Sequence, residues 1–225
     1  MDHRGMRFHY HFLHIIARPL LKSLFKFQVF GVENVPTTGG VLLMSNHASY
    51  VDPVFMGAAV DRNLYYMARS TLFKPGLIEW LLSNMNAFPV HLGVPDRRAI
   101  RRALRLLEDG KLLLIFPEGT RTVDGTLGRA QAGVGLIAYR TTAFIVPVFL
   151  GGTHEALPRG AKMLKLARIT VSFGKPLDME YYRGCEPSRE TYVKIGEEVM
   201  AKIADLQDTI KPEPPKHKGA KTRRI

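Results

Sequence analysis

Short apolar runs alternate with amphipathic stretches along most of this chain. The runs have the length of buried strands, and the stretches between them repeat apolar residues at helical spacing. We predict strands at residues 28–31, 41–44, 64–68, 88–90, 112–116, 143–150 and 169–173. We predict helices at residues 53–60, 72–82, 96–108, 133–139 and 188–210, the second of them interrupted by Pro75 and Gly76. Strands that alternate with helices predict a single α/β domain with a mixed sheet flanked by helices.

Two of these elements carry more detailed predictions. The arginine-rich third helix has Asp96 as its N-cap, and its spacing predicts an inward stripe of Ile100, Leu104 and Leu107. The sixth strand contains Pro147, which has no N–H to donate to a sheet. We therefore expect this strand to lie at an edge of the sheet or to contain a bulge.

The two ends of the chain differ from this alternating middle. Residues 1–27 mix aromatic, aliphatic and basic residues, which predicts an amphipathic helical segment that lies on a membrane interface or packs on the domain. Arg18 and Pro19 interrupt it, and no apolar run approaches the roughly 20 residues of a spanning helix. Residues 211–225 are basic and proline-rich, which predicts a disordered tail. The predicted domain therefore occupies residues 28–210.

Composition narrows the range of partners. The 225 residues are 46% hydrophobic and 23% charged, as in ordinary globular proteins, but the formal net charge is +12. This balance favours anionic lipid surfaces, phosphorylated small molecules or nucleic acid. We expect no nucleic-acid partner, because no nucleic-acid-binding motif is present and the aromatic residues lie in apolar runs. The single cysteine, Cys185, excludes an internal disulfide and fits a reducing compartment, and we expect no secretory leader.

A histidine and an aspartate follow the second predicted strand. His47 comes three residues after residues 41–44, and Asp52 comes five residues after His47. An imidazole titrates near neutrality, so His47 is a candidate general base, and Asp52 is a candidate partner that fixes its tautomer. The spacing alone leaves an alternative in which His47 is a loop histidine and Asp52 is an N-cap before Pro53.

A second polar motif follows the fifth predicted strand. Residues 117–121 read Pro-Glu-Gly-Thr-Arg, and ligands of open α/β sheets bind beyond the carboxyl ends of strands. Arg121 is able to bind a phosphate bidentately, and Gly119 allows a ligand to approach the backbone. Taken alone, this is an ordinary strand-end loop with a surface arginine. Together with His47, it indicates a site for a phosphorylated alcohol.

Three ordered blocks resemble the glycerolipid acyltransferases. They are Asn46-His47-x4-Asp52, the Phe-Pro-Glu-Gly-Thr-Arg of residues 116–121, and the Ile-Val-Pro-Val of residues 145–148. The sequence is most similar to the 1-acyl-sn-glycerol-3-phosphate (lysophosphatidic acid) acyltransferases, from about residue 27 to residue 177. The order of the first two blocks and the distance of about 70 residues between them make the resemblance specific.

The resemblance implies transfer of a fatty acyl group from acyl-CoA or acyl-carrier protein to the hydroxyl of a lysophospholipid. In that reaction His47, held by Asp52, deprotonates the hydroxyl, and no covalent acyl-enzyme or further cofactor is needed. Arg121 binds the acceptor phosphate, Glu118 orders the loop with Gly119, and Thr120 contributes hydrogen bonds. The resemblance also implies an acyl path lined by Val146, Pro147 and Val148, although these residues fit a core strand equally well.

One block departs from the family pattern. Residues 86–93 carry His91 and Leu92 where an acidic or basic residue and then an arginine are common. The arginine that the family pattern supplies as a second contact to the acceptor phosphate is therefore missing from this block, and candidates to replace it are Arg97 or Arg98 and Lys74. The same departure keeps open another acceptor, such as a different lysolipid, an amino-acid lipid or a glycolipid.

The remaining histidines and arginines are candidates for binding a metal ion or an anionic membrane surface. We expect no metal site, because no carboxylate or thiolate accompanies His9, His11 and His14. The arginines at residues 97, 98, 101, 102 and 105 form either a solvated helix face or a surface for anionic headgroups or the phosphates of the acyl donor. With the basic tail, they favour an anionic membrane surface. We predict a peripheral protein on the cytoplasmic face of the cell membrane.

Overall fold

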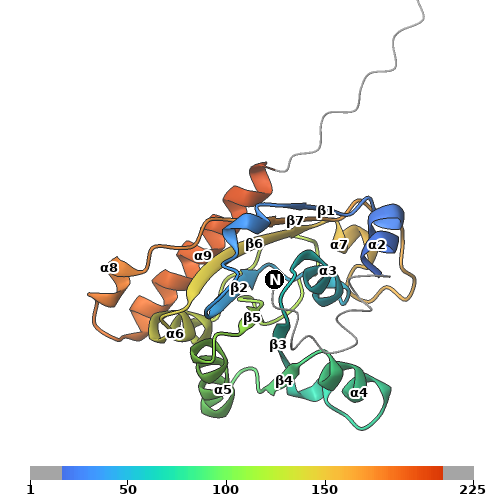
Figure 1. Cartoon of the computed structure of the whole chain (residues 1–225). Helices are drawn as coiled ribbons and strands as arrows, with labels where there is room; N and C mark the ends of the chain where they lie inside the picture. Colours follow the sequence, from blue (N-terminus) through green and yellow to red (C-terminus); the bar gives the residue numbers. More distant parts are fainter. Residues whose placement is uncertain (1–16, 210–225) are drawn as a thin grey trace, which may run out of the picture.

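The computed structural model describes residues 17–209, and a seven-stranded sheet forms its centre (Figure 1). The strand order is β1-β7-β6-β2-β5-β3-β4. The strands are β1 (Gln28–Phe30), β2 (Val41–Ser45), β3 (Leu64–Arg69), β4 (Ala87–Val90), β5 (Leu112–Ile115), β6 (Phe144–Gly151) and β7 (Thr170–Phe173). Every pair is parallel except β6 and β7. The predicted single α/β domain with a mixed sheet is confirmed.

Helices connect these strands and cover both faces of the sheet (Figure 1). They are α2 (Arg18–Phe25), α3 (Asp52–Ala59), α4 (Leu77–Asn84), α5 (Arg97–Glu108), α6 (Ala132–Arg140), α7 (Thr153–Ala156), α8 (Glu180–Arg183) and α9 (Arg189–Thr209). Short 3-10 helices occupy Val32–Asn34 and Ser70–Leu72. Residues 1–16 and 210–225 lie outside the described part, so the predictions for the three N-terminal histidines and for the tail stay predictions.

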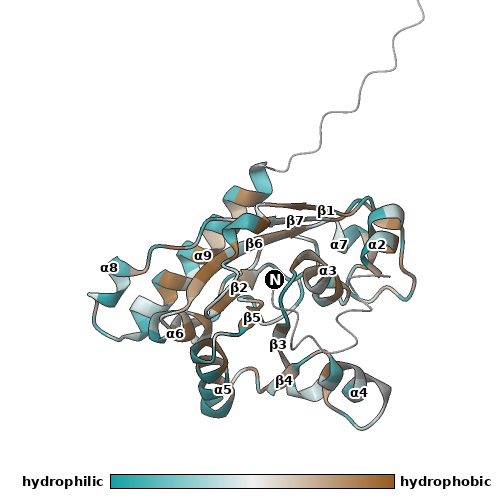
Figure 2. Cartoon of the chain, viewed as in Figure 1, coloured by the Kyte–Doolittle hydropathy of each residue, from teal (hydrophilic) through white to brown (hydrophobic). Residues whose placement is uncertain are grey.

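The core is divided by the sheet into two hydrophobic clusters. Side chains alternate between the faces of a strand, so Val41 and Leu43 of β2 join one cluster while Leu42 and Met44 join the other. The first cluster packs under α2 and α3, and the second packs under α5, α6 and α9. In Figure 2 the strands are mostly brown, whereas α5 and α8 show teal on their outer sides. Burial on both faces explains why the central strands read as continuous apolar runs.

Three local predictions need correction. The helix predicted at residues 72–82 is interrupted at Pro75 and Gly76 as predicted, but the part before the interruption is a 3-10 turn, and α4 begins only after Gly76, which has a φ of 137°. Of the predicted inward stripe of α5, Leu107 is buried as predicted, whereas Ile100 and Leu104 are only half-buried. Ala99 and Ala103 form the rest of the buried side. Small alanines let the helix axis lie close to its neighbours, while the larger side chains at the flanks stay half-buried.

Neither an edge strand nor a bulge explains Pro147, because β6 lies between β7 and β2 and its register with β2 runs without interruption from Phe144 to Val148. The carbonyl of Pro147 accepts from the Gly174 N–H at 2.8 Å, one residue beyond the end of β7. The carbonyl and the nitrogen of one strand residue face the same neighbour, so the missing N–H falls where the pairing with β7 stops. The proline therefore ends a ladder inside the sheet.

The end of the predicted N-terminal segment packs on the domain. Phe25 and Phe27 are buried, and the ring centroids of both lie 5.3 Å from that of Phe55 in α3. Leu20 and Leu24 of α2 remain exposed. Within residues 17–209, no helix has both the length and the apolar character needed to cross a membrane. The boundary at residue 27 stays a prediction.

The crossing of α6 and α9 depends on a glycine. A Cβ at Gly135 would lie 1.9 Å from the Tyr192 carbonyl oxygen, whereas a Cβ at Gly133 on the same helix would meet nothing within 4 Å. We expect Gly135→Ala to lower the free energy of unfolding by about 2 kcal/mol, because the two helices must separate. Gly133→Ala is the matched control and should leave it unchanged or slightly higher. Urea denaturation measures both, and equal stabilities would contradict this packing.

Candidate active site

The two polar motifs meet at the carboxyl ends of the strands. They follow β2 and β5, which are parallel neighbours in the sheet. β2 lies between β6 and β5, and the three strands end at Ser45, Gly151 and Ile115. The segments that follow them carry His47 and Glu118. Sequence positions about 70 residues apart are thereby brought together at the carboxyl ends of the strands, where open α/β sheets bind ligands.

Asp52 holds the His47 ring. The Oδ2 atom of Asp52 lies 2.7 Å from His47 Nδ1 and also accepts from the backbone N–H groups of Ala48, at 2.7 Å, and Ser49, at 2.9 Å. Asp52 is completely buried, and it is the first residue of α3. A proton on Nδ1 satisfies this carboxylate oxygen and leaves the Nε2 lone pair of His47 available to a substrate.

Phe116 fixes the plane of the same ring. Its ring stacks on His47 with a centroid distance of 3.9 Å and an interplanar angle of 12°. The His47 side chain keeps 19% of its surface exposed, so it is held from one side and open to a ligand on the other. Phe116 lies in the second sequence block, but only the fold reveals that it contacts the first.

Glu118 ties the two strand-end loops together. Its Oε1 accepts from the His47 N–H and its Oε2 accepts from the Gly128 N–H, both at 2.9 Å. The His47 carbonyl accepts in turn from the Thr122 N–H at 2.9 Å. Burial raises the pKa of Glu118 above its ordinary value, and the two backbone donors oppose this shift. The contacts of Glu118 therefore order both loops.

Asn46 anchors the segment that precedes the histidine. Its Nδ2 donates to the Leu150 carbonyl at 2.9 Å, and its Oδ1 accepts from the Leu150 N–H at 2.8 Å. Farther along, the Ser49 hydroxyl donates to the Leu157 carbonyl at 2.8 Å. These bonds attach the His47 segment to the end of β6 on one side, while Glu118 attaches it to the β5 loop on the other.

Arg121 presents a cation beside this pair of loops. Its guanidinium carbon lies 3.4 Å from the centroid of the Tyr50 ring, a cation–π contact that sequence reasoning missed. Its Nη1 is buried and has no hydrogen-bond partner among residues 17–209. A buried donor without a partner is costly, and an anion would satisfy it. Gly119, with a φ of 69°, forms the turn that brings Arg121 to this position.

Comparison with known proteins identifies the fold and the family. The family model described as Acyltransferase matches residues 26–151, which include both polar motifs and β6. The chain belongs to the acyltransferase family.

Individual acyltransferases are similar over most of the chain. The chloroplastic 1-acyl-sn-glycerol-3-phosphate acyltransferase LPAT1 of Arabidopsis thaliana is 27% identical over 175 residues, which are 76% of this chain and 49% of that protein. The 1-acyl-sn-glycerol-3-phosphate acyltransferase of Bacillus subtilis is 27% identical over 184 residues, 81% of this chain and 89% of that protein. The chain therefore spans about half the length of its chloroplast relative, but most of the bacterial one.

A solved acyltransferase has the same architecture. The crystal structure of the 1-acyl-sn-glycerophosphate (LPA) acyltransferase PlsC from Thermotoga maritima aligns with a TM-score of 0.65 and 25% sequence identity. The alignment covers 91% of this chain and 85% of that one. The sheet and its flanking helices are thus those of an acyltransferase domain.

The other predicted site residues lie outside the cluster around His47. Thr120 is exposed in the loop between Gly119 and Arg121. Lys74 is exposed between the 3-10 turn and α4, and Arg97 is exposed at the start of α5. Among the described residues, neither Lys74 nor Arg97 has a hydrogen bond or an ion pair with His47 or Asp52. Their predicted contact to the acceptor phosphate stays a prediction.

The strand predicted to line the acyl path is part of the core. Val146 and Val148 are completely buried in the cluster under α2 and α3, and Pro147, between them in the strand, is buried on the opposite face of the sheet. An acyl chain would reach these residues only if neighbouring side chains moved. Their predicted role in the acyl path is untested by the structure.

His91 and Leu92 have contacts of their own. His91 Nδ1 lies 2.8 Å from Asp96 Oδ2, and Asp96 is the N-cap of α5 as predicted, accepting from the N–H groups of Arg98 and Ala99. Hydrogen bonds from the Ala99 and His91 backbone hold the pKa of Asp96 well below its usual range. A Cβ at Gly119 would lie 3.8 Å from Leu92 Cδ2. An apolar side chain therefore stands next to the Arg121 loop.

Proposed function

We propose that this protein transfers a fatty acyl group from acyl-CoA or acyl-carrier protein to the hydroxyl of lysophosphatidic acid, giving phosphatidic acid. The observation that carries this proposal is the 2.7 Å contact between His47 Nδ1 and Asp52 Oδ2, together with the buried Nη1 of Arg121, which has no hydrogen-bond partner among residues 17–209. A base and a cation at one edge of the sheet fit an acceptor that has both a hydroxyl and a phosphate. The names of the relatives, 1-acyl-sn-glycerol-3-phosphate acyltransferases, support this acceptor.

The geometry of the His47–Asp52 pair supports the following mechanism for the acyl transfer. His47 Nε2 takes the proton of the acceptor hydroxyl as the oxygen attacks the thioester carbonyl, and Asp52 stabilises the imidazolium that forms. The tetrahedral intermediate then collapses, the carbon–sulfur bond breaks, and the thiolate takes the proton from His47. The new ester and the free thiol are the products, so no protein nucleophile is acylated.

Arg121 and its loop select the acceptor in this proposal. The guanidinium is held by Tyr50, and its Nη1 has no partner within the described part of the chain. A guanidinium is able to bind a phosphate bidentately. Leu92, next to Gly119, favours a second candidate, in which the same chemistry acts on another acceptor. An apolar side chain there gives the acceptor headgroup one cationic contact fewer than the family pattern supplies.

The assay for this function uses purified protein, acyl-CoA or acyl-carrier protein, and a panel of lysolipid acceptors. We expect phosphatidic acid from lysophosphatidic acid, and a loss of kcat of about 10²- to 10⁴-fold in His47→Ala, because the general base is removed. Arg121→Gln should raise the KM for lysophosphatidic acid at least tenfold, because a charge-assisted contact is lost. His91→Ala, an exposed histidine bonded to Asp96, is the matched control and should retain activity.

Full activity in His47→Ala would contradict the proposed mechanism. Acyl transfer to another lysolipid, with none to lysophosphatidic acid, would instead support the second candidate acceptor. Mass spectrometry of the products distinguishes these results.

We also propose that the protein works on the cytoplasmic face of the cell membrane, with the active-site edge of the sheet against the lipid. Both substrates carry acyl chains, and large exposed apolar side chains occur in the segments at this edge. They are Leu20, Leu24, Tyr50, Leu92, Val94, Val123, Met163, Leu164 and Leu166. The net charge of +12 would add attraction to anionic lipid.

The double variant Leu164→Asp/Leu166→Asp tests this orientation. We expect at least a tenfold loss of affinity for phosphatidylglycerol vesicles in a flotation assay, because two exposed leucines would no longer enter the interface. Val32→Asp/Phe144→Asp, which alters exposed apolar residues at the opposite sheet edge, should bind as the natural protein does. Equal losses in both variants would contradict the orientation.

A further inference from the structure

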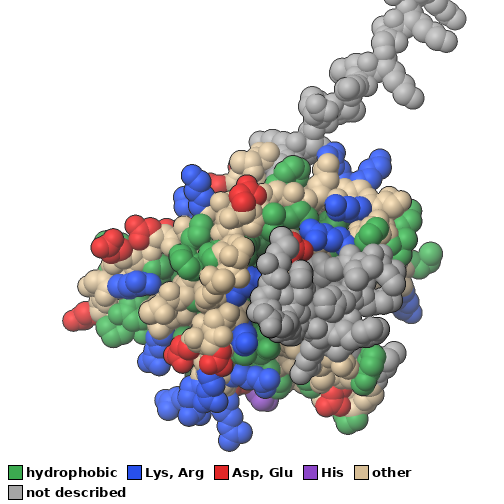
Figure 3. All heavy atoms as spheres, viewed as in Figure 1, with side chains coloured by type: hydrophobic (Ala, Val, Ile, Leu, Met, Phe, Trp, Pro, Cys, Tyr) green, Lys and Arg blue, Asp and Glu red, His purple; other side chains and the backbone are tan. Residues whose placement is uncertain are grey.

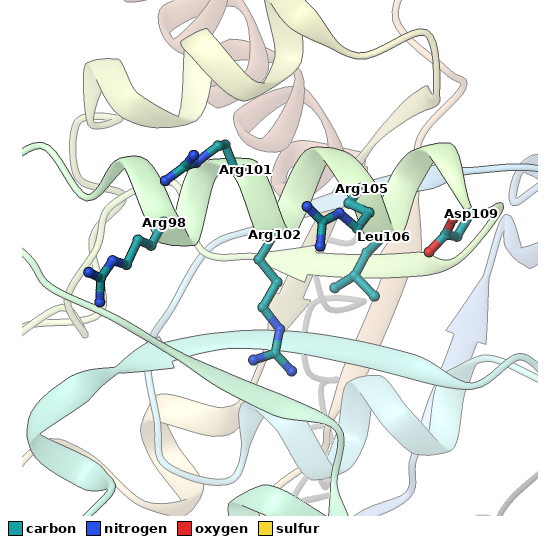
Figure 4. Close-up of a pocket in the computed structure, with 6 residues that line it drawn as sticks. All are labelled: Arg98, Arg101, Arg102, Arg105, Leu106 and Asp109. Atoms are coloured by element: carbon teal, nitrogen blue, oxygen red, sulfur yellow. The ribbon is translucent and has the colours of Figure 1, made fainter.

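A cluster of four arginines on α5 lies outside the active site described above. Arg98, Arg101, Arg102 and Arg105 line an open pocket of about 460 Å³ together with Leu106 and Asp109 (Figure 4). We call this the arginine pocket. In the space-filling view, blue side chains gather at the lower edge of the molecule, where α5 lies in Figure 1 (Figure 3).

The arginine pocket follows one side of the helix. Arg98 and Arg102 are four residues apart, as are Arg101 and Arg105, so the two members of each pair are neighbours on the surface of α5. Figure 4 shows their guanidinium groups distributed along the helix from the first turn toward the last. Arg102 is held over the Phe88 ring at 4.9 Å from its centroid, and Arg101 Nε donates to the Arg97 carbonyl at 3.3 Å. Two of the four cations are thus partly positioned by the protein.

The positive charge of the pocket is not compensated locally. In the described part of the chain, no ion pair involves these four arginines, and Asp109 is the acidic residue that lines the pocket with them. Like charges four residues apart destabilise a helix, and so does a cation in its first turn. A ligand that carries several negative charges would relieve this repulsion.

A short segment connects the neighbourhood of the Arg121 loop to the arginine pocket. Leu92 lies against Gly119, and the segment that follows it leads through Asp96 directly into α5. The helix then runs antiparallel to β5, away from the active-site edge, for 12 residues or about 18 Å. A ligand held here by its phosphates could therefore extend a flexible arm back to the carboxyl ends of the strands, where His47 lies.

We propose that the arginine pocket binds the nucleotide end of a coenzyme A thioester, the acyl donor. The inference rests on the proposed function, because it assigns a site to the donor of that reaction. Guanidinium groups bind phosphates bidentately and stack on planar bases, and Leu106 adds apolar contact. The volume lies in the range of small-molecule sites.

The shape of the pocket favours this ligand over a bilayer. An anionic membrane presents a plane, whereas the arginines of this open pocket follow α5 away from the sheet edge that carries the exposed apolar residues. Only the first turn of α5 is near that edge, so a bilayer there would not reach Arg105. A soluble, phosphate-rich ligand is able to contact all four arginines.

The double variant Arg101→Gln/Arg105→Gln tests the proposal with the full-length protein. We expect the KM for palmitoyl-CoA to rise about tenfold, because two exposed cationic contacts are lost, and we expect this difference to shrink at high salt. The kcat and the KM for lysophosphatidic acid should stay within about twofold. Arg183→Gln/Arg189→Gln removes the same charge from α8 and α9 and is the matched control. Calorimetric titration with adenosine 3′,5′-bisphosphate should show the same loss of affinity.

Several results would overturn the proposal. One is an unchanged KM for palmitoyl-CoA together with an unchanged affinity for the bisphosphate. Another is an effect confined to acyl-carrier protein as donor, which would assign this face to a carrier protein. A third is an effect confined to phosphatidylglycerol vesicles, which would assign it to the membrane. If no lysolipid is acylated, the proposed function fails, and the bisphosphate titration still decides whether the pocket binds the nucleotide.

Discussion

The Asp52 carboxylate is the constraint on which the candidate active site depends. One of its oxygens accepts from the His47 ring and from two backbone N–H groups, and the residue is completely buried at the start of α3. The same interaction therefore closes the turn after β2, begins the next helix and orients the imidazole. A buried carboxylate that lost these donors would be strongly destabilising, so structure and chemistry depend on the same atoms.

Glu118 extends this arrangement to the neighbouring strand. It accepts from the backbone of His47 and of Gly128, so a second buried carboxylate sets the distance between the β2 and β5 loops. Arg121 follows three residues later and is held by Tyr50 from the His47 loop. The base and the cation are thus supported by contacts that cross between the two loops. The parallel pairing of β2 with β5 makes these contacts possible.

The sequence could predict those features that depend on residues close together along the chain. Buried apolar runs identified the strands, and the spacing of His47 and Asp52 indicated a bonded pair, because both features are local. The position of Pro147 inside the sheet depends on strand order, which local patterns do not encode. The stacking of Phe116 on His47 and of Arg121 on Tyr50 depends on contacts between loops about 70 residues apart. Packing against neighbouring elements likewise decided which side of α5 is buried.

The most direct test of the central claim is the tautomer of His47, measured by ¹⁵N NMR of histidine-labelled protein at neutral to alkaline pH. A His47→Gln sample identifies the resonances of this ring. The account predicts a proton on Nδ1, a bare Nε2, and loss of the Nδ1 proton signal in Asp52→Asn. A neutral ring with its proton on Nε2 would contradict it, because that nitrogen could not accept a proton from the acceptor hydroxyl.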